Sequence, residues 1–233
     1  MKRRAFLSSC AAGCAAAALP GSVSAGLQPH YYSRTLLVDA HGQPLRATSV
    51  VARRNYIFHY PYASTPCFLL DLGHAVRPSS SLQTAESKSY DWPGGVGPRG
   101  SLVAYSAICA HKLSYPTRDV SFISYRATPT APSGAAAVIH CCSEHSQYDP
   151  AHGARVVSGP APQPLAAILL EYHAAQDMLY AVGTLGGEMF NEFFAKFAFR
   201  LALDNGGRDA RQPTGSQAQV LALDSFCRQQ IRC

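Results

Sequence analysis

The chain has little charge, and it lacks a basic stripe. Only 15% of its 233 residues are Asp, Glu, Lys or Arg, and the formal net charge is +6. Three of the 20 Lys and Arg residues and none of the 14 acids lie in residues 1–25, so the remainder carries 17 − 14 = +3. This charge is too small for the electrostatic footprint of a nucleic-acid-binding protein.

Several motifs of catalysis are also missing. The sequence has no internal repeat, no glycine loop of the phosphate-binding kind, no Ser/His/Asp arrangement with supporting context and no acid/base pair with a credible spacing. These absences give no support to nucleotide hydrolysis or nucleophilic catalysis, and we expect no catalytic residue in the chain. A hydrophobic content of 47% over this length is enough to bury a core.

The first 25 residues have the pattern of an export signal. The twin arginines Arg3 and Arg4 precede an Ala-rich apolar stretch, and "SVSA" ends in a small-x-small pattern. We expect the Tat route, cleavage after Ala25 and a periplasmic protein. The alternative is a signal retained as a membrane anchor, for which the stretch is short and rich in Ala. No other segment reaches 18 apolar residues.

Short segments rich in Val, Ile, Leu, Tyr and Phe occupy residues 33–182, separated by Gly, Pro, Asn, Asp and Ser. This pattern predicts an all-β sandwich or barrel. The expected strands lie at 34–40, 47–52, 55–62, 67–73, 101–107, 120–127, 136–141, 154–159, 165–173 and 177–183. Long loops are expected at 78–100 and 128–136.

The hydrophobic period changes after residue 186. Apolar residues recur at helical spacing in "EMFNEFFAKFAFRLAL", which predicts an amphipathic helix packed on the β core. The alternative for its phenylalanine face is a docking surface for a larger subunit. A weak last helix is expected within 217–231. We therefore divide the mature chain into a β domain over 26–186 and a helical C-terminal extension over 187–233.

Two pairs of metal-ligating residues stand out. Cys109 and His111 form a C-x-H pair directly after an expected strand, and Cys142 and His145 form a C-x-x-H pair after thirty intervening residues. One zinc ion could take both pairs, but zinc sites usually pair like ligands within a loop. Mixed pairs on two β loops favour a Rieske [2Fe–2S] centre, with the cysteines on one iron and the histidines on the other.

The surrounding sequence resembles the Rieske family. "YDPAHGARVVSGPAPQPL" is similar to the stretch that follows the family's second ligand pair, and "GPAP" matches its proline loop. "FHYPYASTPCFLLDLG", "GGVGPRGSLVAYSAICAH" and "YHAAQDMLYAVG" resemble the small subunit of periplasmic arsenite oxidases.

The resemblance implies a β sandwich or barrel with a small cluster-binding subdomain and one [2Fe–2S] cluster per chain. The cluster-binding loops would span about 107–116 and 140–164. Its expected partners are a large molybdopterin subunit and a soluble cytochrome c or cupredoxin as electron acceptor. The residues expected around the cluster are Lys112, Leu113, Ser146, Tyr148, Gly159, Pro160, Ala161 and Pro162. A quinol-oxidising subunit of a bc-type complex and a structural zinc domain are the alternatives.

The sequence departs from the family pattern in two ways. The family often has C-x-H-x-x-C and C-x-C-H with the extra cysteines joined by a disulfide, and those positions here are Ser114 and Glu144. The stretch from His145 to Asp149 is also one residue shorter than usual. With Cys142 as the ligand, Cys141 is expected to be a buried thiol. Elsewhere, Cys227 and Cys233 are candidates for a disulfide with each other, and His140 and His152 lie outside the motif.

Overall fold

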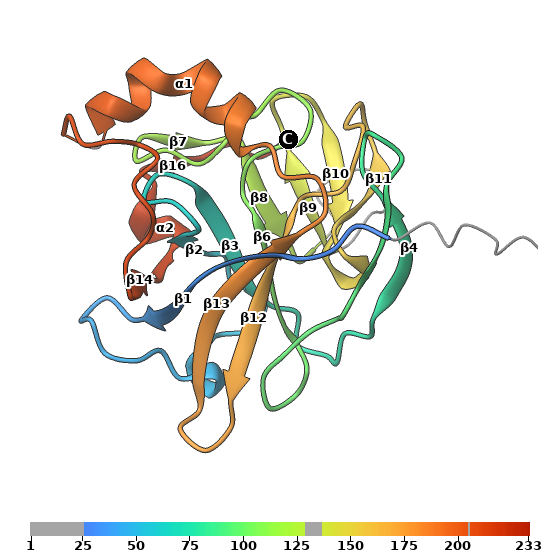
Figure 1. Cartoon of the computed structure of the whole chain (residues 1–233), viewed down its shortest axis with the longest axis vertical. Coiled ribbons are helices and arrows are strands. Elements are labelled where there is room, and N and C mark those ends of the chain that lie inside the picture. The colour runs from blue at the N-terminus through green and yellow to red at the C-terminus, as the bar shows by residue number, and fades with distance from the viewer. Residues whose placement is uncertain (1–25, 129–136, 205) are drawn as a thin grey trace, which may run out of the picture.

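A large and a small β-sheet organise the chain in the computed structural model, which describes residues 26–128, 137–204 and 206–233 (Figure 1). The large sheet has the order β14-β1-β13-β12-β6-β3-β2-β15, and the small sheet has the order β11-β10-β9-β8. The strands of the large sheet are β1 (His30–Val38), β2 (Tyr56–His59), β3 (Pro66–Asp71), β6 (Leu102–Ser106), β12 (Ala167–His173), β13 (Met178–Leu185), β14 (Gln217–Gln219) and β15 (Leu221–Ala222). Those of the small sheet are β8 (Ile123–Arg126), β9 (Val138–Cys141), β10 (Ser146–Asp149) and β11 (Arg155–Ser158).

The large sheet almost closes into a barrel, which confirms the predicted all-β class. Its outermost strands, β14 and β15, are separated in the sequence by the single residue Val220. Strand β3 is buried on both faces, since alternate residues of a strand point to opposite sides. Phe68 and Leu70 join one apolar cluster, while Cys67 and Leu69 join another.

Two sequence predictions in the β region are wrong. Residues 47–49 form a 3₁₀ turn (η1, Ala47–Ser49) rather than a strand, and the expected loop at 78–100 contains the hairpin of β4 (Ser79–Gln83) and β5 (Ser89–Trp92). Trp92 anchors that hairpin by packing against Tyr105, with ring centroids 5.8 Å apart. Residues 1–25 and most of the expected loop at 128–136 lie outside the described residues. In the part that is described, no helix is long and apolar enough to cross a membrane.

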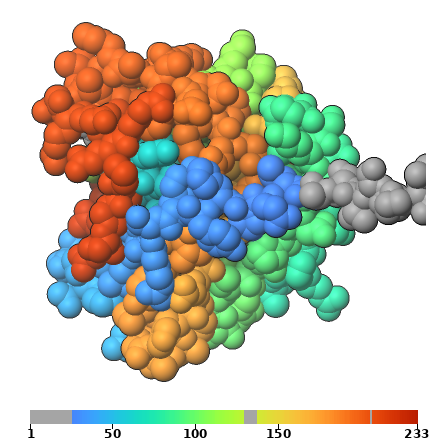
Figure 2. Space-filling model, viewed as in Figure 1, coloured from blue at the N-terminus to red at the C-terminus, as the bar shows by residue number. Residues whose placement is uncertain are grey.

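Helix α1 (Phe190–Asp204) confirms the predicted amphipathic helix. Its inner face buries Phe190, Phe193, Phe194 and Leu201, and this face packs on Ile108 and Leu113. The outer face leaves Phe199 81% exposed. In the space-filling view α1 and the segment after it cover the upper left of the molecule (Figure 2).

The predicted helix at 217–231 is wrong except for one turn, α2 (Leu223–Phe226). Residues 217–222 instead add β14 beside β1 and β15 beside β2. The edges of β1 and β2 offer unpaired backbone groups to a further strand. The residues of 217–222 do not by themselves show that they pair with these distant edges. Finally β16 (Gln229–Gln230) pairs in parallel with β7 (Val120–Ser121), and the C-terminus lies near β9 and β10 (Figure 1).

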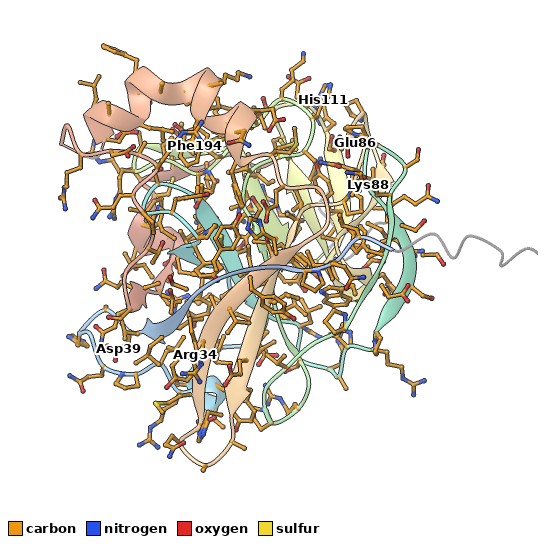
Figure 3. The ribbon with its side chains drawn as sticks, viewed as in Figure 1. Arg34, Asp39, Glu86, Lys88, His111 and Phe194 are labelled. Atoms are coloured by element: carbon orange, nitrogen blue, oxygen red, sulfur yellow. A yellow bond between two sulfur atoms is a disulfide. The ribbon has the colours of Figure 1, made fainter. Side chains whose placement is uncertain are left out.

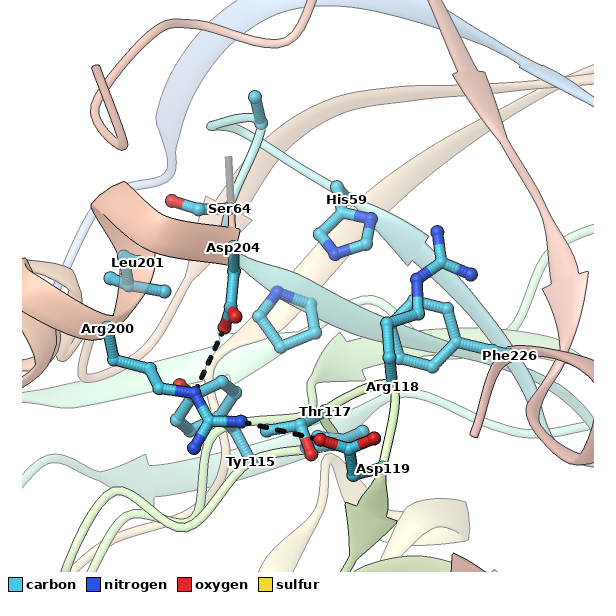
Figure 4. A pocket seen from close by; sticks show the side chains of 13 residues that line it. His59, Ser64, Tyr115, Thr117, Arg118, Asp119, Arg200, Leu201, Asp204 and Phe226 are labelled. Carbon is cyan, nitrogen blue, oxygen red and sulfur yellow. Dashed lines mark hydrogen bonds and ion pairs between the residues drawn. The ribbon is translucent and has the colours of Figure 1, made fainter. Parts of the chain in front are cut away.

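A pocket of ≈ 310 Å³ lies where α1 and α2 meet β2 and the segment after β6 (Figure 4). Within it, Arg200 lies 3.3 Å from Asp204 and 3.9 Å from Asp119. Burial, with a smaller contribution from Arg118, lowers the pKa of His59 to about 4. These contacts fasten the C-terminal segment to the β body.

Candidate metal centre

The first ligand loop leaves β6 and turns tightly at Cys109. The Cys109 N–H donates to the Ser114 carbonyl at 2.8 Å, and the Leu113 N–H donates to the Cys109 carbonyl at 3.0 Å. Leu113 adopts a left-handed conformation with φ of 66° and is buried. Cys109 is fully buried, while His111 is half-buried at the edge of the molecule (Figure 3).

The second loop is the turn of the β9–β10 hairpin. Cys141 and Ser146 are cross-strand partners at its base, so residues 142–145 make the turn. His145 closes the turn at φ 56°, a left-handed conformation that is uncommon outside glycine. The proline loop packs directly on this turn, because a Cβ added at Gly159 would lie 2.6 Å from the His145 carbonyl oxygen.

Cys141, and not Cys142, faces Cys109. The two thiols form a hydrogen bond, and the Tyr148 hydroxyl lies 3.2 Å from Cys109 Sγ. The backbone N–H groups of His111 and Lys112 also point at this sulfur. The hydrogen bond from Cys141, aided by these donors, lowers the pKa of Cys109 to about 6, while the pKa of Cys141 is raised. The pair is therefore built to hold negative charge on sulfur.

Beside the cysteine pair, His111 faces Glu144. The imidazole Nδ1 lies 3.7 Å from the Glu144 carboxylate, and Lys112 Nζ lies 3.5 Å from the same oxygen. Two buried polar atoms here, His111 Nδ1 and Ser146 Oγ, have no hydrogen-bond partner. Buried polar atoms are rarely left without partners in folded proteins, so these two orphans are consistent with a site shaped for a bound group.

Two residues of the predicted ligand set, Cys142 and His145, lie away from Cys109 in the structure. Cys142 forms a disulfide with Cys233, and the exposed His145 ring lies 6.0 Å from that of His140. Neighbouring residues of a strand point to opposite faces, so the buried Cys141 and its neighbour Cys142 cannot both face Cys109. Cys227 and Cys233, the two candidates for a disulfide with each other, do not pair, since Cys227 is a buried free thiol and Cys233 is bonded to Cys142.

One signal in the sequence could have identified Cys141 and Glu144. The stretch from His145 to Asp149 is one residue short of the family pattern, and this gap disappears when Cys141 is taken as the cysteine. Glu144 then stands three places after it, where the family has its histidine. Ser146 and Asp149 also fall in their usual places, and Ser143 takes the position of the disulfide cysteine.

The other predicted neighbours surround these loops in different ways. Leu113 packs under α1, and the Lys112 carbonyl accepts a hydrogen bond of 2.7 Å from Lys196. Ser146 and Tyr148 are buried in β10. In the proline loop, Ala161 packs against the core, while Pro160 and Pro162 are exposed.

The donor set is thus two sulfurs, one imidazole and one carboxylate, carried by two loops at one end of the β fold. No family model matches the sequence. Among solved structures, the soluble domain of the Rieske protein II of Sulfolobus acidocaldarius is similar. It is 30% identical over 56% of this chain and 68% of that chain, with a TM-score of 0.44. The mostly antiparallel β architecture, the paired loops and this sequence identity give the chain a Rieske-type fold.

Proposed function

We propose that the chain is an electron-transfer protein with one [2Fe–2S] cluster, held by Cys109 and Cys141 on one iron and by His111 and Glu144 on the other. The observation that carries this proposal is the arrangement of the donors in two pairs. The thiols are hydrogen-bonded to each other, and the imidazole and carboxylate are 3.7 Å apart. Rieske centres have two cysteines on one iron and two histidines on the other, and Glu144 takes the place of one histidine here.

The bound cluster would supply reversible transfer of a single electron. The chain's own residues set the conditions for it. Backbone N–H groups and the Tyr148 hydroxyl stabilise negative charge on Cys109, and burial of Cys109 and Cys141 excludes water. The His111 side chain is 26% exposed, so its edge is the proposed point of electron entry or exit.

A single zinc ion on these four residues is less consistent with the geometry. Tetrahedral zinc with bonds of 2.0–2.3 Å places its ligand atoms roughly 3.5 Å apart. Among the described residues, three ligand atoms lie within 4.8 Å of one another only in the set His140, His145 and Cys233. The two pairs facing each other across the loops are therefore too far apart to share one ion as they stand.

We further propose that the chain acts as the small subunit of an arsenite-oxidase-like molybdenum oxidoreductase. It would receive electrons from a large molybdopterin subunit and pass them to a cytochrome c or cupredoxin in the periplasm. The supporting observations are the segments that resemble such subunits, the Tat-like N-terminus and the lack of a catalytic arrangement in the sequence. This assignment makes the chain an electron carrier within a complex.

Anaerobic reconstitution of the full chain with iron and sulfide tests the cluster assignment. The wild type should hold two irons and two sulfides and give a Rieske-type EPR signal after reduction. Cys141→Ser should abolish the signal, whereas Cys142→Ser should retain it because Cys142 faces away from Cys109. A signal that survives in Cys141→Ser and is lost in Cys142→Ser would restore the ligand set predicted from motif spacing.

A further inference from the structure

A second group of metal-ligating side chains lies on the other face of the β9–β10 hairpin. His140 Nδ1 and Nε2 each lie 3.6 Å from Cys233 Sγ, and Cys233 is bonded to Cys142. The ligand atoms of His140, His145 and Cys233 all lie within 4.8 Å of one another. Two imidazoles and the Cys233 sulfur thus meet at one place, outside the proposed cluster site, and the Cys142 sulfur is bonded to that of Cys233.

The fold brings these four residues together from two distant segments. Alternation along β9 and into the turn places His140 and Cys142 on the face opposite Cys141. The left-handed turn at His145 returns its ring toward His140. The C-terminal tail is held nearby by the β7–β16 pairing and by Arg126, whose guanidinium donates to the Ile231 carbonyl at 2.5 Å.

We propose that reduction of the Cys142–Cys233 disulfide creates a Cys2His2 site for one Zn²⁺, with His140, His145 and the two released thiolates as ligands. The reductant would be a dithiol, which gives two electrons and two protons to the disulfide and itself becomes a disulfide. Zn²⁺ then displaces both thiol protons to solution. Cys142 is half-buried and Cys233 is exposed, so the bond is open to such a reductant.

The geometry and chemistry of the group favour zinc. The 3.6 Å between His140 nitrogens and Cys233 Sγ matches the roughly 3.5 Å edge of a tetrahedron with zinc bonds of 2.0–2.3 Å. Two thiolates and two imidazoles complete a closed structural zinc site without a water ligand. The C-x-x-H spacing of Cys142 and His145 would then belong to a ligand pair whose partners are Cys233 and His140.

Zinc titration of the full chain, loaded with its iron–sulfur cluster, tests this proposal. Oxidised and phosphine-reduced protein compete with a chromophoric chelator for Zn²⁺, and iron content is measured before and after. Reduced wild type should take up one tightly bound zinc that the oxidised protein does not bind, with its iron retained. His145→Ala should weaken that binding on the order of 100-fold or more, since loss of a direct ligand exceeds the 10–100-fold effect of an outer-shell partner.

Matched controls separate this site from the cluster. His173→Ala removes another exposed histidine and should leave zinc binding unchanged. Cys233→Ser should remove the difference between oxidised and reduced protein. Equal zinc binding by wild type and His145→Ala, or no zinc uptake after reduction, would overturn the proposal. If the reduced chain takes up zinc but assembles no iron–sulfur cluster, the zinc proposal stands and the proposed electron-transfer function is overturned.

Discussion

Replacing Glu144 by His should raise the reduction potential of the cluster. Glu144 lies 3.7 Å from His111 Nδ1 and is proposed to share its iron. A carboxylate ligand adds one negative charge that a neutral imidazole does not. This charge opposes the further electron that reduction brings, and its removal therefore favours the reduced state.

The size of this effect follows from the known ligand classes. Replacing two thiolates by two imidazoles changes the potential from about −400 mV to between about −150 and +300 mV. The middle of that range lies roughly 475 mV above −400 mV. Divided between the two replaced thiolates, this is roughly 240 mV for each anionic ligand. We therefore expect Glu144→His to raise the potential by on the order of 200 mV.

An EPR-monitored redox titration of reconstituted protein measures this shift. The control is Glu171→Gln, which removes a carboxylate paired with Arg34. Arg34 lies at the opposite end of the molecule from His111 in Figure 3, and water and salt screen exposed charges beyond about 10 Å. A lower or unchanged potential in Glu144→His would refute the assignment of Glu144 to the iron.

Three other predictions test the site and the fold. Tyr148→Phe should lower the potential by roughly 40–90 mV, because the hydroxyl beside Cys109 Sγ stabilises the reduced cluster by roughly 1–2 kcal/mol; voltammetry measures the shift, and an unchanged potential would contradict it. Phe193→Ala should cost about 3–5 kcal/mol of unfolding free energy because the side chain is fully buried under α1, whereas Phe199→Ala should change it by about 0.5 kcal/mol or less; equal effects in denaturant titration would exclude this packing. The pKa of His59 is lowered to about 4 in the folded protein, so on acidification the unfolded chain takes up the imidazole proton at a higher pH than the folded chain does. The free energy of unfolding should therefore be at its full value above about pH 6.5 and fall by up to roughly 3 kcal/mol toward pH 4. His59→Gln should lose this pH dependence in unfolding measured across that window.

The elements that could be predicted are those in which apolar residues recur at a regular spacing along the sequence. The spacing of the phenylalanines in α1 gave the helix and its buried face, and the apolar segments gave most strands of the large sheet. Strands β14 and β15 were missed because their partners lie on the edges of β1 and β2, about 160–180 residues away along the chain. Composition within 217–222 carries no trace of those edges.

The sequence located both ligand loops but did not choose between adjacent cysteines. That choice depends on the register of the β9–β10 hairpin, in which Cys141 opposes Ser146. A shift of one residue exchanges the faces of a strand, so motif spacing alone does not decide which of the two cysteines faces Cys109. The partner of Cys142 could not be predicted, because Cys233 is 91 residues away and arrives through the β7–β16 pairing.

Counting the nitrogen ligands of the cluster decides whether His111 is joined on its iron by Glu144 or by a second histidine. Protein with ¹⁵N-labelled histidine, reconstituted and reduced, would be compared with unlabelled protein by pulsed EPR. We expect one strongly coupled histidine nitrogen, from His111, and its loss in His111→Ala with no change in His145→Ala. Two coupled histidine nitrogens, one of them lost in His145→Ala, would contradict it.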